Sequence, residues 1–389
     1  MYFAHPYQFG TRFERKGLLS LDGFVMVGNT SDARNATSSK TNILNMYGQH
    51  QMHQIGKNIN ESDITATSVD ALNNLWRATK TDDDYAVLEF SGSSEYSGGS
   101  VLLEFNLTNE FFFGAELPFY KLEINTPTYT DKTPTDAKNA AWTNFLKNFD
   151  TILSDLSMDR AATKETGIGD VSAFVGWTRS VDELDNLDFL DATVRVGATL
   201  GTADAKNEDK AFSIAPGYDK HKGFFVSFDT AFGTHEHLSF GFHAKQLFLF
   251  KSTKTMRMQS AAGQNGFIKL GKGTATRNMG NIYEVGGFAQ LEHSYLSAYT
   301  GYTYAHKGKD ELIADNTNLF PSSIVNADSM LQGWSTHTVH VGVEIDLTDE
   351  KRRFHPKVSI FYNHIVRAKQ AFLNHTFGGT LGFSVTWDL

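Results

Sequence analysis

Few residues in this chain have types and spacings suited to metal binding. His50 with His53, and His235 with His237, are spaced so that their imidazole nitrogens could bind one metal ion. His235 and His237 occupy a predicted turn, where contact with water is a sufficient reason for them. Structural roles are therefore favoured for these histidines, and no metal site is expected.

The acidic runs and the absence of catalytic motifs also argue against a metal site and against an enzyme. Runs 82–84 and 204–209 could bind Ca²⁺, but neither has the glycine and terminal glutamate of an EF-hand loop. The chain contains no Gly-x-Ser-x-Gly elbow, no His-Glu-x-x-His and no P-loop. It also has no Cys, which excludes disulfides, thiolate metal sites and Cys nucleophiles. We predict a protein that is not an enzyme and that has no cofactor.

A larger charged set lies on one side of segments in which every second residue is apolar. If this side lines a water-filled pore, its acidic excess raises the local cation concentration and favours cations over anions. The alternative is that these charges pair across the interior and keep a barrel round. The candidate lumen and selectivity residues are Asp22, Glu89, Glu104, Glu116, Asp170, Asp191, Arg195, Asp229, His243, Lys245, Glu284, His340, Glu344 and Asp346.

The alternation that positions these charges indicates membrane-spanning strands. It is clear in 101–107, 111–119, 190–200 and 339–347, and it recurs in about thirteen segments near the ~9 to 11 residues that cross a membrane with tilt. A mean hydropathy of −0.33 fits such strands, because polar and apolar residues alternate. No run of about 18 apolar residues exists, so no transmembrane helix is predicted.

The C-terminal segment 381–389 carries the clearest alternation and ends on an apolar residue. It resembles the terminal strand by which Gram-negative outer-membrane β-barrels are recognised by their assembly machinery, although that family usually ends in an aromatic residue. The resemblance implies a bacterial outer-membrane location, with the lipid bilayer and the barrel assembly machinery as partners. Its assembly-signal residues are Phe383, Val385, Trp387 and Leu389.

Connection lengths support an up-and-down barrel in a single domain, 1–389. Short turns alternate with long connections near 125–166, 203–221, 252–277 and 310–333, as periplasmic turns and outer loops do. A single-chain barrel normally holds an even number of strands, so we expect about fourteen, with twelve as the alternative. Residues 30–83 would then hide a strand, form a long loop or enter the lumen as a plug or hatch.

Two segments have helical rather than alternating spacing. Residues 136–158 place apolar side chains on one helix face behind Thr135 or Asp136 as N-cap, and 68–78 repeat the pattern weakly. In an outer loop, the longer helix could constrict the pore or cap the barrel rim. The candidate gate residues are Trp142, Phe145 and Phe149.

The segment 165–171, Glu-Thr-Gly-Ile-Gly-Asp-Val, opens an amphipathic strand. It resembles a turn common in outer-membrane transporters for fatty acids and aromatic hydrocarbons. The resemblance implies a hydrophobic substrate and an N-terminal hatch inside a fourteen-stranded barrel.

The function predicted from these features is a passive outer-membrane channel or diffusion transporter for small solutes. A non-conducting barrel with a surface, adhesive or structural role is the first alternative, and the hydrophobic-substrate transporter with a hatch is the second. A soluble β-sandwich is disfavoured because Phe111, Phe113, Leu117 and Phe119 would face water. The net charge of −9 does not suit nucleic acid, and homo-oligomer formation is left open. The first residues lack a signal peptide, so we expect the numbering to begin at a mature or engineered start.

Overall fold

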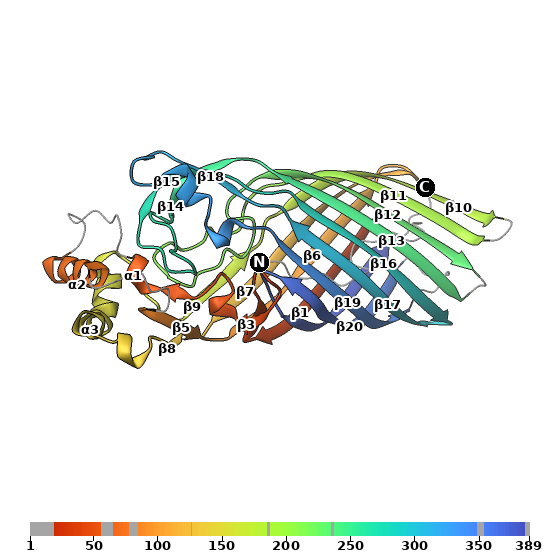
Figure 1. Ribbon diagram of the computed structural model, residues 1–389. Coiled ribbons are helices and arrows are strands. Elements are labelled where there is room, and N and C mark those ends of the chain that lie inside the picture. Colours follow the sequence, from red (N-terminus) through yellow and green to blue (C-terminus); the bar gives the residue numbers. More distant parts are fainter. Residues whose placement is uncertain are drawn as a thin grey trace.

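The structure is a computed structural model that describes residues 19–55, 65–77, 85–125, 127–184, 187–234, 237–347 and 354–385. It has a β-barrel at one end and a large folded region at the other, which we call the outer cap (Figure 1). No helix in these ranges is long and apolar enough to cross a membrane.

Twelve antiparallel strands of the described chain form the closed barrel, so the expected number of fourteen is wrong and the alternative of twelve is right. The first strand pairs with the last, from Leu19 opposite Val385 to Asn29 opposite His375, which closes the wall. The strands are β1 (Leu19–Thr30), β6 (Ser94–Asn106), β7 (Phe111–Ile124), β10 (Ser172–Leu184), β11 (Leu187–Thr199), β12 (Gly223–Thr234), β13 (Leu238–Leu249), β16 (Ile282–His293), β17 (Leu296–Lys307), β19 (Trp334–Asp346), β20 (Phe354–Lys369) and β22 (His375–Val385).

The wall strands form because their period-two pattern matches two different environments. On β1, Val25 and Val27 face outward and are 60% and 57% exposed, whereas Phe24 and Met26 face inward and are buried. Closure pairs the backbone groups of neighbouring strands, and each unpaired group in hydrocarbon would cost several kcal/mol. An outward apolar band on a closed barrel is therefore stable only against lipid.

The strand count differs from expectation because the segment around Leu88 and Phe90 is not a wall strand. It forms β5 (Val87–Ser91), which pairs with β4 (His50–Gln51) and β8 (Thr128–Asp131) in the outer cap. Its alternating apolar residues are buried in the cap core rather than exposed to lipid. The chain therefore leaves β1, passes through the cap and returns as β6, which makes the number of wall strands even.

One break interrupts the wall between β7 and the strand that follows it around the barrel. Both β9 (Thr163–Ile168) and β10 pair with β7, at 119–124 and 111–116 respectively. Between them Gly169 donates its N–H to the carbonyl of Pro118 at 2.8 Å, and a Cβ on Gly169 would lie 2.8 Å from the Pro118 Cβ. The Gly-Ile-Gly-Asp segment thus forms a kink in the wall that needs a glycine beside the proline.

The outer cap is built from the long connections, which fold around one large apolar core and a smaller one formed by residues within 256–275 and 312–331. Its largest helix, α3, begins after Asn139, whose side chain accepts the N–H of Trp142 and caps the helix a few residues later than expected. The cap elements are β2 (Asp32–Arg34), β3 (Lys40–Asn42), η1 (Ile43–Asn45), α1 (Met52–Ile55), α2 (Ala66–Arg77), η3 (Thr135–Ala137), α3 (Ala140–Asp155), β14 (Ser252–Arg257), β15 (Lys272–Asn278), β18 (Glu311–Ala314), α4 (Ser322–Val325), η4 (Ser329–Leu331) and β21 (Ala371–Phe372), together with β4, β5 and β8.

Candidate functional site: a cavity between the barrel and the outer cap

A cavity of about 380 Å³ lies where the barrel opens beneath the outer cap. The barrel contributes side chains from β1, β6, β7, β13 and β16, and the cap contributes the loop 206–219 and strands β14 and β15. Volumes of this size hold small organic molecules, which usually bind in mainly apolar pockets with a few polar groups. The apolar lining includes Phe24, Met46, Leu122, Ile214, Leu247, Met256, Phe267, Met279, Ile282, Leu312, Trp334 and Phe372.

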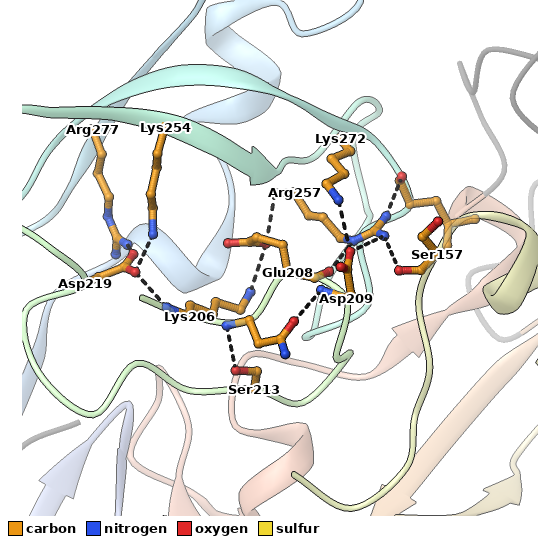
Figure 2. Close-up of polar contacts among 12 residues, drawn as sticks. Ser157, Lys206, Glu208, Asp209, Ser213, Asp219, Lys254, Arg257, Lys272 and Arg277 are labelled. Atoms are coloured by element: carbon orange, nitrogen blue, oxygen red, sulfur yellow. Dashed lines mark hydrogen bonds and ion pairs between the residues drawn. The ribbon is translucent and has the colours of Figure 1, made fainter. Parts of the chain in front are cut away.

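A buried ion-pair network stands at the cap side of this cavity (Figure 2). Asp219 accepts from Lys254 and from Arg277, the latter at 3.1 Å between Nη1 and Oδ2. Arg277 also donates through Nε to Asp310 Oδ2 at 3.0 Å, and Lys307 pairs with the same carboxylate. These residues come from four different segments, so the network ties the cap loops to the end of β17.

The electrostatic balance of the network keeps its acids ionised. Burial alone would raise the pKa of the Asp219 carboxyl, but Lys254 and Arg277 outweigh burial and hold that pKa below its ordinary value. Burial would also raise the pKa of the Asp310 carboxyl, but Arg277 and Lys307 outweigh burial and lower that pKa. The two carboxylates in turn raise the pKa of Arg277 against the effect of burial. The two carboxylates and the Arg277 guanidinium are therefore all charged at neutral pH.

A second basic group, Arg257, has a structural role beside the cavity. Its guanidinium donates to the carbonyls of Glu208, Leu270, Leu156 and Ser157 at 2.6 to 3.2 Å (Figure 2). Burial lowers the pKa of Arg257 despite the nearby acidic side chains. Because Leu156 and Ser157 directly follow α3, Arg257 fixes the end of that helix to the loops around the cavity.

Most of the predicted lumen residues lie on the inner side of the wall or at its kink. Asp170 is at the kink, where it accepts the N–H of Ala203 at 2.9 Å and that of Tyr218 at 2.5 Å. Glu116 and Asp170 line the cavity itself. The residues that the burial pattern places on the inner side of strands are Asp22, Glu104, Glu116, Asp191, Arg195, Asp229, His243, Lys245, Glu284, His340, Glu344 and Asp346.

Several of these inner charges are close to charges of opposite sign. Arg195 pairs with Asp229, and its Nε lies 3.8 Å from Glu104 Oε1. It therefore links β11 to the neighbouring strand β12 and to β6 further around the barrel. The Nε2 of His243 lies 3.3 Å from Glu284 Oε1. These contacts show that part of the inner charge pairs across strands. The role of the remaining charge in selectivity stays a prediction.

Glu89 is placed differently from the prediction. It lies on β5 in the outer cap, where its half-exposed carboxylate pairs with Lys132 at 2.8 Å, and it is not on a wall strand. The error has the same cause as the wrong strand count, since the alternation around Glu89 reflects burial in the cap core.

The gate candidates are also part of the cap core. Trp142 and Phe145 stack at 5.5 Å between ring centroids, Phe149 packs next to Phe145, and all three side chains are buried. Of the two positions considered for this helix, the structure places it in the cap above the barrel and its aromatic face in the cap interior. None of these rings lines the cavity.

The remaining sequence candidates are placed as follows. Phe383 and Val385 belong to β22, where Phe383 stacks on Phe354 at 5.1 Å, while Trp387 and Leu389 lie outside the described residues. His50 is buried in the cap and accepts the N–H of Phe267 through Nε2 at 3.1 Å. His235 and the run 82–84 also fall outside the described ranges.

The ion-pair network was not anticipated from the sequence. Asp219, Lys254, Arg277 and Asp310 are far apart in the chain and lie in loops or short strands without a periodic pattern. No local signal distinguishes them from solvated surface charges, because their partners are defined only by how the loops fold together.

Comparison with known proteins supports the fold. No protein-family model and no curated protein sequence matches the chain. Among solved structures, the chain is similar to the COG4313 outer membrane channel from Pseudomonas putida F1, with a TM-score of 0.51, 10% identity, and coverage of 98% of this chain and 99% of that one. It is also similar to the transport unit of the autotransporter AIDA-I from Escherichia coli, with a TM-score of 0.42, 9% identity, and coverage of 98% and 95%. The similarity to the first of these structures, together with the closed wall, shows the fold of an outer-membrane β-barrel.

Proposed function

We propose that this protein is a passive outer-membrane channel for small, partly apolar solutes. The observation that supports this most directly is the cavity of about 380 Å³ beneath the outer cap, which has aromatic and methionine side chains beside buried charges. Such a lining offers an apolar solute a better environment than water does.

The charges of the lumen define the second part of the proposal. In and below the cavity, the inner wall carries more acidic than basic residues, including Glu116 and Glu284, which line the cavity, and Glu344. An acidic interior raises the local concentration of cations. The proposed preference is for solutes that combine an apolar group with a positive charge over those with a negative charge.

Solute flux into proteoliposomes tests both parts. We expect faster uptake of benzyltrimethylammonium, an aromatic and permanently charged cation that crosses bare lipid slowly, than of benzoate or arabinose. Ala215 lines the cavity and Ala36 is exposed on the cap, so Ala215→Trp should reduce uptake at least several-fold while Ala36→Trp leaves it unchanged.

The same experiment can reject the proposal. If folded protein admits none of the three solutes faster than empty liposomes, the non-conducting barrel is the better description. Equal sensitivity to Ala215→Trp and Ala36→Trp would show that solutes do not pass through this cavity.

A further inference from the structure

One sector of the outer wall carries clustered tyrosines and histidines beside an arginine, whereas most outward side chains elsewhere on the wall are apolar. We call it the Tyr/His patch, and its defining residues are Tyr302, Tyr304, His337, His364, Arg367 and His375. The rings of Tyr304 and His337 lie 4.8 Å apart, and those of His364 and His375 stack at 4.3 Å. These contacts join β17 to β19 and β20 to β22, and His337 lies opposite Arg367 in the β19–β20 pair, so the patch spans four adjacent strands.

The position of the patch along the strands is at the outer edge of the membrane. Tyr304 pairs with His337 and His337 with Arg367, close to the ends of β17, β19 and β20 that meet the outer cap. A 12-residue strand such as β17 is about 40 Å long, or roughly 28 Å along the membrane normal at a tilt of about 45°. Tyr304, His337, Arg367 and His375, near the strand ends, therefore lie at the level of the outer lipid head groups, and Tyr302 and His364 lie closer to the middle of the membrane.

Positive charge is concentrated at this place. Arg367 and Lys369 are exposed at the end of β20, and no ion pair joins either to another residue in the described ranges. The small sheet of β2, β3 and β21 adds Arg34 and Lys40 next to β20, and Lys40 pairs with Asp32 at 2.6 Å. Arginine, lysine and tyrosine hydroxyls are the donors that proteins use for phosphate groups.

Another sector of the wall, at β12 and β13, is different at the same height. The outer ends of β12 and β13 carry Phe224 and Phe248, which stack at 4.5 Å, followed by Phe250. Aromatic residues at both edges of the membrane are a general property of such barrels. Stacked histidines beside an arginine are not, so the Tyr/His patch requires a reason beyond the general aromatic belt.

We propose that the Tyr/His patch, with Arg367 and Lys369, binds the phosphorylated head group of a glycolipid of the outer leaflet. The lipid would lie with its acyl chains along the apolar lower wall, where Val343 and Ile360 are 38% and 57% exposed. Its phosphates would then meet the basic residues at the strand ends. A lipid at this position joins the wall to the β2–β3–β21 sheet of the cap.

Native mass spectrometry of the purified full chain tests the proposal with a defined probe. The protein is titrated with lipid A that carries two phosphates and with lipid A of the same acyl chains from which the phosphates have been removed. We expect wild-type protein to bind the phosphorylated form at least about tenfold more tightly, and the double variant Arg367→Gln/Lys369→Gln to lose about tenfold in that affinity.

A matched control is available on the phenylalanine sector. Lys222 and Lys251 flank β12 and β13 at their outer ends and are exposed, so Lys222→Gln/Lys251→Gln removes the same charge at the same height. This control should bind phosphorylated lipid A as wild type does, and heat-modified gel mobility verifies that all variants are folded. Equal binding of both lipid forms by wild type, or equal losses in both double variants, would overturn the proposal. So would a stable dimer of the wild type that only the Arg367→Gln/Lys369→Gln variant loses, because the patch would then be a contact between copies of the chain.

Discussion

The barrel wall exposes apolar side chains on its outer surface, whereas the outer cap buries them in its interior. On the barrel wall Val25 is 60% exposed and polar groups such as Glu104 are buried inside, whereas in the cap Phe145 is fully buried. One chain can hold both arrangements because the solvent differs, lipid around the barrel and water around the cap. The difference shows that exposure of an apolar side chain identifies the surrounding medium only when the fold of its region is known.

Truncation of a cap-core ring should have a large effect on the cap. Phe145 is 0% exposed and packs between Trp142 and Phe149, so Phe145→Ala leaves a cavity and should destabilise the cap by about 3–5 kcal/mol. Hydrogen exchange of residues 140–155 measures this loss. Exchange in β19 and β20 should stay slow, and loss of protection there as well would mean that the cap and the barrel unfold as one unit.

A charge on the lipid-facing wall should have the next largest effect. Val25 lies near the middle of β1, and Val25→Arg should destabilise the barrel by about 2–4 kcal/mol because the guanidinium would face hydrocarbon. The same change at Leu19, at the end of the strand, should cost only about 0–1 kcal/mol. Reversible unfolding in urea from lipid vesicles measures both, and equal costs at the two depths would contradict a lipid-facing wall.

Acid should weaken the cap before it weakens the barrel wall. Burial, with a contribution from Lys269, lowers the pKa of His50 to about 3. In the unfolded chain the histidine has a pKa near ~6.5, whereas in the folded cap it stays neutral to a much lower pH. As the pH falls from ~6.5 toward the folded pKa, the unfolded chain gains a proton that the folded cap does not, so the folded cap loses stability. Cap stability should thus fall by up to about 1.4 kcal/mol per pH unit below ~6.5, or about 2 kcal/mol at pH 5.

The variant His50→Gln separates this effect from others. It should flatten the pH dependence of hydrogen exchange in 140–155, although His221, whose pKa is also lowered by burial, will leave a smaller slope. Asp219 and Asp310 stay ionised over this range because their pKa values are below the ordinary value. A slope that is unchanged in His50→Gln would exclude His50 as the source.

Removal of one inner carboxylate should have a small effect on ion selectivity. Glu116 lines the cavity and accepts the hydroxyl of Ser100 at 2.9 Å, so Glu116→Gln removes one charge and keeps the side-chain shape. We expect the ratio of cation to anion permeability to fall by about twofold or less, because the other inner acids remain. Reversal potentials in a salt gradient measure the ratio, and an anion preference in wild type would contradict the proposed charge of the lumen.

The regular parts of the fold were predictable because they depend on near neighbours. The alternation in segments such as 190–200 predicts β11, and the helical spacing after Asp136 predicts α3 with its apolar face. The turns were predictable because short and long connections alternate. The lumen side of most strands followed from the same parity, since a strand side chain can point to only two faces.

The errors came from segments whose environment depends on distant parts of the chain. Leu88 and Phe90 alternate as a wall strand does, yet their partners are β4 and β8 of the cap. Phe145 has the spacing of a helix that could enter a pore, but it faces the aromatic core formed with residues near 50, 90 and 212. For Leu88 and Phe90 the alternation was interpreted correctly and the surrounding medium was not. For the helix of Phe145 two positions were predicted, and contacts with distant residues decide between them.

The order of residues is enough to predict an antiparallel barrel with a lipid-facing side, because a period of two allows each strand one apolar and one polar face. It does not predict how the long connections fold, since their contacts join residues such as Asp219, Arg277 and Asp310 across more than one loop. Those contacts depend on the barrel, which holds the loop ends at one rim. The cavity and the outer cap are therefore properties of the three-dimensional assembly, whereas the wall is a property of the local pattern.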